Sequence, residues 1–64
     1  METIQENSKV IFESAGKERK SGTIKKITLG DNDGMGDEYL VQLRGPGGKK
    51  IKIYHNYNKV RLNN

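Results

Sequence analysis

The feature that most constrains this chain is a set of short segments in which apolar residues recur at every second position. This spacing is the period of a β-strand, whose side chains alternate between two faces. It is found in residues 9–13, 39–44, 50–54 and 59–63. Polar or glycine-rich stretches separate these segments, and no segment keeps a helical period for three turns. The pattern therefore predicts an all-β fold.

A further strand is predicted around Ile24 and Ile27, where the alternation fails. These two residues are three positions apart, so they cannot share one face of a regular strand. A β-bulge at Lys25-Lys26 restores the pattern and bends the strand, as closed barrels require. The candidate core then consists of Val10, Phe12, Ile24, Ile27, Val41, Leu43, Ile51, Ile53, Val60 and Leu62.

The connections between the strands have compositions typical of loops and turns. Residues 14–21 are polar, and residues 30–37 contain three glycines and three aspartates, which excludes a strand. Gly45-Pro46-Gly47-Gly48 predicts a tight hairpin turn with positive φ at Gly47. Residues 55–58 are too few for an α-helix, and we interpret them as a single 3₁₀ turn before the last strand.

Five short strands in this order, with hairpin-like loops and a final turn, resemble the SH3-like small barrel. The resemblance covers about residues 8–62. Val10, Phe12, Gly22 and Ile24 fall at the spacing of the KOW motif of ribosomal and transcription-elongation proteins, although Arg19 stands where that family usually has a second glycine. The general pattern is also similar to Tudor-like barrels. We expect a five-stranded SH3-like barrel over residues 8–64, preceded by a flexible tail, residues 1–7.

Charge is distributed unevenly along the chain. Residues 39–64 contain six Lys and Arg and no Asp or Glu, whereas residues 1–38 contain six Lys and Arg and eight Asp and Glu. Like charges on paired strands repel one another, and an anionic partner relieves this repulsion. Nucleic acid, either RNA or DNA, is therefore the leading class of partner.

Strand alternation places many of these basic side chains on one predicted face. If Val41 and Leu43 point to the core, Arg44 points outward, and the hairpin lays its strand beside Lys50 and Lys52. Arg and Lys contact phosphates, while a tyrosine stacks on a base or donates a hydrogen bond. The predicted nucleic-acid-binding residues are Arg44, Lys50, Lys52, Tyr54, Lys59, Arg61, Lys25 and Lys26.

Other chemistry receives little support from the sequence. The acidic segment 31–38 starts like a calcium loop, but Met35 occupies a position that needs an oxygen ligand. His55 is the single histidine and the chain has no cysteine, so we expect neither a metal nor a cofactor, and we interpret His55 as polar surface. The aromatic residues do not predict a methyl-lysine cage.

Ile53-Tyr54, with Lys59–Asn63 after a short turn, also resembles the end of the plasmid-borne type II dihydrofolate reductases. Those enzymes are SH3-like barrels that assemble into tetramers around one pore. Lys52 replaces their glutamine, so a reductase is a remote alternative. We expect a non-enzymatic module that binds nucleic acid. The main alternative is a protein–protein adaptor or a modulator of a larger transcription or translation machine.

The apolar runs are far shorter than the roughly 20 residues of a membrane span, and no signal-peptide pattern opens the chain. We therefore expect a cytoplasmic protein with no membrane partner. Usage rich in Lys, Asn and Ile is typical of AT-rich genomes, such as those of bacteria or phages.

Overall fold

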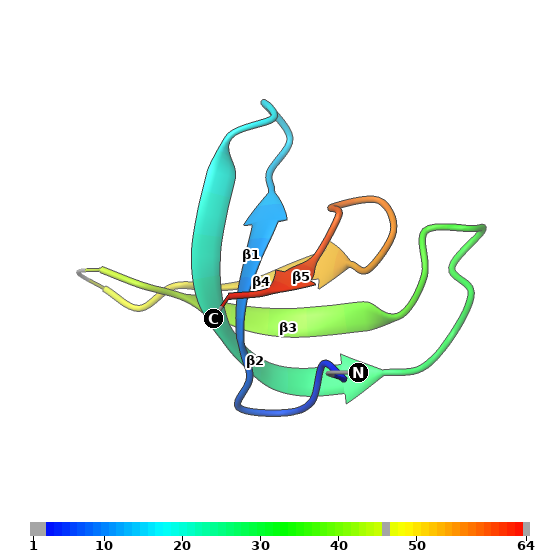
Figure 1. The fold of residues 1–64 in the computed structure, drawn as a ribbon, viewed down its shortest axis with the longest axis horizontal. Coiled ribbons are helices and arrows are strands. Elements are labelled where there is room, and N and C mark those ends of the chain that lie inside the picture. The colour runs from blue at the N-terminus through cyan, green and yellow to red at the C-terminus, as the bar shows by residue number, and fades with distance from the viewer. Residues whose placement is uncertain (1–2, 46, 64) are drawn as a thin grey trace.

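The computed structural model describes residues 3–45 and 47–63, which form five β-strands (Figure 1). The strands are β1 (Lys9–Glu13), β2 (Arg19–Thr28), β3 (Glu38–Leu43), β4 (Lys50–Tyr54) and β5 (Arg61–Leu62). Neighbours are antiparallel, and their order across the sheet is β4-β3-β2-β1-β5. The described residues contain no helix, and hence none with the length and apolar character to cross a bilayer. The predicted all-β fold with five strands is confirmed.

The long strand β2 curls the sheet. In Figure 1 its first half runs beside β1, and its second half runs crosswise to the first, beside β3. Gly22 permits close contact with β3, because a Cβ atom there would lie 2.6 Å from the Gln42 carbonyl oxygen. The pairing with β3 then shifts register between Ile24 and Lys26, which confirms the predicted bulge. The shift returns Ile27 to the core side of the sheet.

The sheet is curled, but strand pairing does not close it into the expected barrel. β4 and β5 form its two edges, and the described residues show no pairing between them. Asn58, which is 8% exposed, spans the gap instead. Its Nδ2 donates to the Glu13 carbonyl at the end of β1, and its Oδ1 accepts from the Tyr54 amide at the end of β4, both at 2.8 Å. One side chain therefore connects the β4 edge to β1.

The chain between β4 and β5 is a hydrogen-bonded turn and lacks the predicted 3₁₀ geometry. The amides of Asn58 and Val60 donate to carbonyls four and five residues earlier, and Lys59 alone makes the three-residue bond typical of a 3₁₀ turn. The cause is tertiary, because the amides of Asn56 and Tyr57 donate to the distant Met35 carbonyl. These two amides are therefore unable to join a local 3₁₀ ladder.

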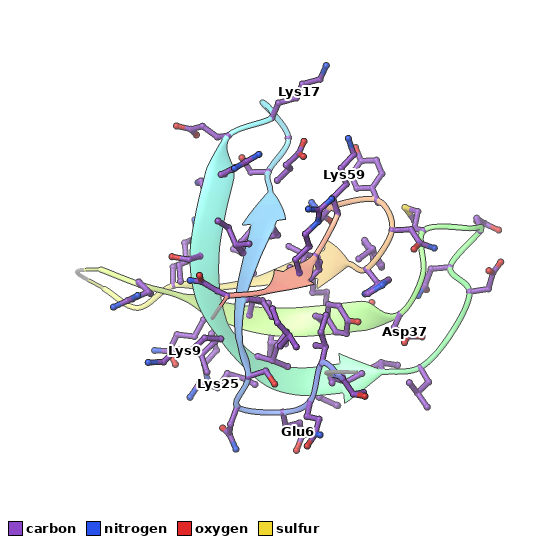
Figure 2. The ribbon with its side chains drawn as sticks, in the orientation of Figure 1. Glu6, Lys9, Lys17, Lys25, Asp37 and Lys59 are labelled. Atoms are coloured by element: carbon purple, nitrogen blue, oxygen red, sulfur yellow. The ribbon has the colours of Figure 1, made fainter. Side chains whose placement is uncertain are left out.

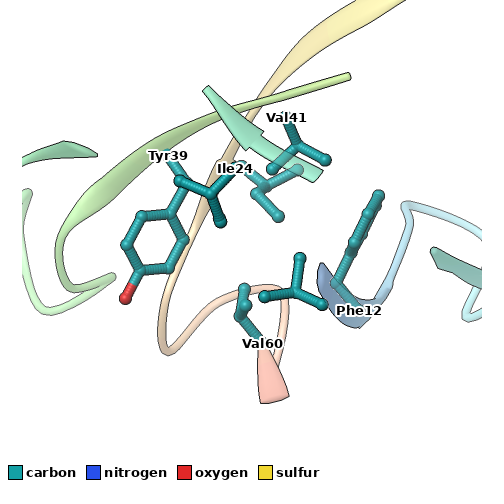
Figure 3. Close-up of a cluster of buried hydrophobic side chains, with 7 residues drawn as sticks. Phe12, Ile24, Tyr39, Val41 and Val60 are labelled. Atoms are coloured by element: carbon teal, nitrogen blue, oxygen red, sulfur yellow. The ribbon is translucent and has the colours of Figure 1, made fainter. Parts of the chain in front are cut away.

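The core lies inside the curl of the sheet. Its buried members are Val10, Phe12, Ile24, Tyr39, Val41, Ile53 and Val60. Six of them were predicted, and the other predicted residues, Ile27, Leu43, Ile51 and Leu62, are half-buried against this cluster. Tyr39 is 3% exposed and was missed, although it alternates in phase with Val41. Its ring lies at one end of the cluster and Phe12 lies at the other (Figure 3).

Parts of residues 3–8 contact the sheet, and the expectation that residues 1–7 form a flexible tail stays a prediction. Ile4 packs against the core cluster. The Asn7 amide donates to the Ile24 carbonyl, and the Ile24 amide donates to the Ser8 carbonyl. The described part of the tail therefore extends the pairing of β2 and covers one side of the core.

The hairpin between β3 and β4 sets the register of the predicted interface. Gly47 has a φ of 94°, as predicted, while the expectation for Pro46 falls outside the described residues. The Leu43 amide donates to the Lys49 carbonyl across the hairpin. This register pairs the residues at positions 40 and 42 of β3 with Lys52 and Lys50 of β4.

Candidate nucleic-acid interface

The outer face of the sheet carries two cross-strand rows of side chains. They point outward because they alternate with core residues such as Val41 and Ile53. From β4 to β1, the first row is Lys50, Gln42, Thr23 and Lys9. From β4 to β2, the second row is Lys52, Leu40 and Lys26. The structure describes every residue of both rows, and neither row contains a carboxylate. We call these seven residues together with Lys25 the lysine face.

The bulge in β2 adds a cation to this face. Lys25 is the extra residue of the bulge, and both it and Lys26 are exposed. In a regular strand two consecutive side chains point to opposite faces, so one of these lysines would point toward the core. A bulge re-aims the side chain locally and avoids this cost. The irregularity that bends β2 therefore also concentrates positive charge on its outer side.

Lys9 belongs to the lysine face but was absent from the predicted site. It is exposed on β1 and pairs with Thr23. Figure 2 shows Lys9 beside Lys25, on the outer side of the bend in β2. The sequence contained the signal, because the alternation that buries Val10 turns Lys9 outward.

Two predicted residues border the lysine face. Arg44 directly follows β3 and is exposed at the hairpin. Tyr54 is half-buried and pairs with Glu38. The carboxylate of Glu38 therefore ends the basic surface on that side, and Tyr54 lies at this border rather than within the basic surface.

Two further predicted residues, Lys59 and Arg61, are not part of the lysine face. Arg61 belongs to β5 and pairs with Ile11 of β1, at the opposite edge of the strand order from β4. Lys59 Nζ lies 3.9 Å from Glu13 Oε2, and Figure 2 shows Lys59 well away from the bend in β2. Lys50 and Lys52 therefore belong to the β4 edge of the sheet, whereas Arg61 belongs to the β5 edge and Lys59 to the turn before it. Alternation tells which side of its own strand a residue occupies, but it does not tell where that strand lies in the sheet.

The acidic loop between β2 and β3 is built from its own hydrogen bonds. Asn32 Nδ2 donates to the Gly36 carbonyl at 2.6 Å, and Asp37 Oδ1 accepts from the Gly30 amide at 3.1 Å. The Met35 carbonyl accepts two amides of the β4–β5 turn, which fastens the loop to that turn. Among the described residues, no three His, Cys, Asp or Glu side chains are arranged to hold a metal.

His55 has a partner that the sequence did not indicate. The Tyr39 hydroxyl lies 2.8 Å from His55 Nδ1, and the two rings meet edge to face with centroids 5.8 Å apart. Burial raises the pKa of Tyr39 above its ordinary value, and the negative charge of Asp37 raises this pKa further. His55 is half-buried rather than plain polar surface, and the pair fixes the β4–β5 turn to the end of the core.

Comparison with known proteins gave no match. No protein-family model, curated protein or solved structure matches this chain. The likeness to SH3-like, KOW and Tudor-like barrels therefore depends on the strand order and the quoted residues. The evidence for a function lies in the geometry and charge of the chain itself.

Proposed function

We propose that this chain is a small, non-enzymatic module that binds the backbone of RNA or DNA through the lysine face. The supporting observation is the pair of carboxylate-free rows. With the bulge, they gather five exposed lysines on one surface: Lys9, Lys25, Lys26, Lys50 and Lys52. Mutual repulsion makes such a surface unfavourable alone, and a polyanion neutralises it.

The spacing of these lysines suits a chain of phosphates. Neighbouring strands lie about 4.8 Å apart, so the path along the curled sheet from Lys50 to Lys9 covers three strand spacings, or roughly 14 Å. A single small anion does not bridge this distance, whereas successive phosphates do. Lysine ammonium groups act as flexible point charges, which fits contact with a backbone more than fixed recognition of one group.

The chemistry of the face favours the backbone over the bases. Its centre is the half-buried Leu40, and its polar members Gln42 and Thr23 suit phosphate or sugar oxygens. Proteins that bind single strands through their bases usually stack them on exposed aromatic rings. The lysine face contains no aromatic residue, and Tyr54 lies beside Glu38 at its border. Binding is therefore expected to depend little on base sequence.

We also propose that the fold is an SH3-like small barrel whose closure is completed by Asn58. The strand order β5-β1-β2-β3-β4, the bend at Gly22 and the short turn before β5 support this assignment. The interior of such a barrel is filled by side chains, so a ligand binds on its outside. The outer face of the β2–β3–β4 sheet is one such surface. A cytoplasmic location, where nucleic acid is accessible, fits the proposal.

The test compares two double variants that remove the same charge. Lys50→Gln with Lys52→Gln changes the lysine face, whereas Lys17→Gln with Lys20→Gln changes the region of the β1–β2 loop (Figure 2). Affinity for an arbitrary duplex of about 20 base pairs is measured over a range of salt concentrations. The first variant should weaken binding and lower the salt slope by about two, one for each lost phosphate contact. The second variant should change the slope far less. Equal slopes for both variants would exclude the lysine face as the site.

A second candidate function is a protein adaptor. Leu29 and Tyr57 are 80% and 65% exposed, which is unusual for large apolar side chains. Tyr57 adjoins the acidic loop, because its amide donates to the Met35 carbonyl. A protein partner with apolar and basic groups would complement this region. Undetectable affinity for RNA and DNA at low salt, together with a protein complex that Tyr57→Ser abolishes, would favour the adaptor.

A further inference from the structure

A second basic cluster lies on the outer side of β1 and β5. It surrounds a hollow of about 140 Å³ lined by Ile11, Phe12, Glu13, Arg19, Lys59 and Arg61. The hollow does not include any residue of the lysine face. Three of its lining side chains are cationic, and they come from β2, β5 and the turn before β5. Segments far apart in the sequence therefore converge on one small surface depression.

Strand pairing explains this convergence. On the outer side of β1, Ile11 pairs with Arg61 of β5, and Glu13 pairs with Arg19 of β2. Lys59 reaches the same carboxylate from the turn, with its Nζ 3.9 Å from Glu13 Oε2. Glu13 therefore has Lys59 as its ion-pair partner and Arg19 as its cross-strand neighbour, and the half-buried Ile11 supplies an apolar wall.

We propose that this hollow binds one terminal phosphate group, a phosphate monoester or inorganic phosphate. Three cations and one carboxylate leave a formal charge of +2 around the hollow. A phosphate monoester carries about −1.5 to −2 at neutral pH and matches this charge, whereas an internal phosphodiester carries half as much. Two arginines suit the ligand further, because their planar forks bind phosphate oxygens in pairs.

The small volume of the hollow distinguishes this site from the lysine face. Pockets that enclose drug-sized ligands have volumes of roughly 300–1,000 Å³. A hollow of about 140 Å³ accommodates one small anionic group and leaves a sugar and base outside. The lysine face spreads its charges over an open sheet surface, whereas three cations of this cluster line one hollow. The site goes beyond the proposed backbone-binding function and does not depend on it.

Inorganic phosphate is the direct probe. Amide resonances are recorded while phosphate is added at constant ionic strength maintained with sodium chloride. Saturable shifts are expected at residues 11–13, 19 and 59–61. Arg19→Gln with Arg61→Gln should weaken binding at least about tenfold, because two charge-assisted hydrogen-bond donors are lost. The matched control is Lys50→Gln with Lys52→Gln, which removes the same charge from the lysine face and should change the affinity less than about twofold.

Glu13→Gln should have the opposite effect on phosphate affinity. Its carboxylate competes with the ligand for Lys59, so its removal should tighten phosphate binding about threefold. Shifts that never saturate, equal weakening in both double variants, or no gain in Glu13→Gln would overturn the site. The double variants must retain the wild-type pattern of amide resonances away from the hollow, which reports folding independently of binding.

The source of the phosphate is resolved with matched ligands. Three ligands are compared: a 12-nucleotide strand that carries a 5′-phosphate, the same strand with a 5′-hydroxyl, and a nucleoside 5′-monophosphate. A preference for the phosphorylated end that Arg19→Gln with Arg61→Gln abolishes assigns the site to nucleic-acid termini. Saturation by the monophosphate with equal binding of both oligonucleotides assigns it to a small phosphorylated molecule. Loss of duplex binding in Lys50→Gln with Lys52→Gln tests the lysine face separately.

Discussion

The lysine face and the β4–β5 turn, residues 55–60, are two parts of the same small protein that are held by different interactions. The face rests on the backbone ladders that join β1, β2, β3 and β4, which are regular except at the β2 bulge, and its outward side chains contribute little to them. The turn depends on particular side chains, because Asn58 bonds to two strands and His55 bonds to Tyr39. The side chains of the lysine face can therefore change with little effect on the fold. The β4–β5 turn, which helps to hold the sheet together, tolerates little change. Four variants, two of them with a matched control, test this contrast, beginning with the largest expected effect.

Gly22→Ala is expected to be the most damaging change, because it acts on the ladder that supports the lysine face. The new Cβ would lie 2.5 Å from Val41 Cγ1 and 2.6 Å from the Gln42 carbonyl oxygen, so the backbone of β3 must move. We expect a loss of about 3 kcal/mol in the free energy of unfolding. A core of this size rarely supplies more than about 3–5 kcal/mol, so much of the protein should unfold. Urea denaturation followed by circular dichroism measures the change.

Gly16→Ala is the matched control for this glycine. A Cβ at position 16 meets no atom within 4 Å, so stability should change little. Equal losses for the two glycines would show that close packing against β3 is not what position 22 requires.

Asn58→Ala should be nearly as harmful, although it removes one side chain from a turn. It leaves the Tyr54 amide and the Glu13 carbonyl without their partners, which should cost about 2–3 kcal/mol. Asn56→Ala is the control, because its 3.2 Å bond to the Gly34 carbonyl is exposed and should be worth about 0.5 kcal/mol. Similar losses for the two variants would mean that the Asn58 side chain does not connect β4 to β1.

Tyr39→Phe should have an intermediate effect with a distinctive pH dependence. Loss of the bond to His55 should cost about 1 kcal/mol at neutral pH. Burial raises the pKa of Tyr39 in the folded protein, while the unfolded chain keeps a value of about 10. The unfolded chain therefore loses this proton first, so the stability contributed by neutral Tyr39 is complete below about pH 10. It disappears as the pH rises through the raised pKa.

The measurement is the difference in unfolding free energy between wild type and Tyr39→Phe from pH 8 to 12. The difference should shrink or reverse above about pH 10, because phenylalanine does not ionise. A difference that stays constant over this range would contradict the raised pKa.

Lys50→Gln with Lys52→Gln should have the smallest effect on stability. Both side chains are exposed and make no contact with the core, and their removal relieves repulsion worth a few tenths of a kcal/mol. Thermal unfolding should show an equal or slightly higher midpoint than wild type. A loss above about 1 kcal/mol would show that the face is structurally constrained and would remove the contrast with the turn.

The sequence determined the elements of this fold and their orientation. Alternation located the strands, and the failed alternation between Ile24 and Ile27 predicted the bulge that the structure contains. It also predicted that Lys50 and Lys52 point outward beside β3. These features are local, because the two faces of a strand follow from covalent geometry and from the transfer of apolar side chains out of water.

Tertiary structure decided how those elements are joined and which cations share a surface. Arg61 and Arg19 line the same hollow because β1 pairs with both β5 and β2. Asn58 bonds to a carbonyl 45 residues earlier, and His55 bonds to a tyrosine hydroxyl 16 residues earlier. No periodic pattern encodes such partners, because a single hydrogen bond depends on where two distant segments come to lie. The alternation of side chains thus set the faces of the strands, and the packing of the complete sheet set the sites.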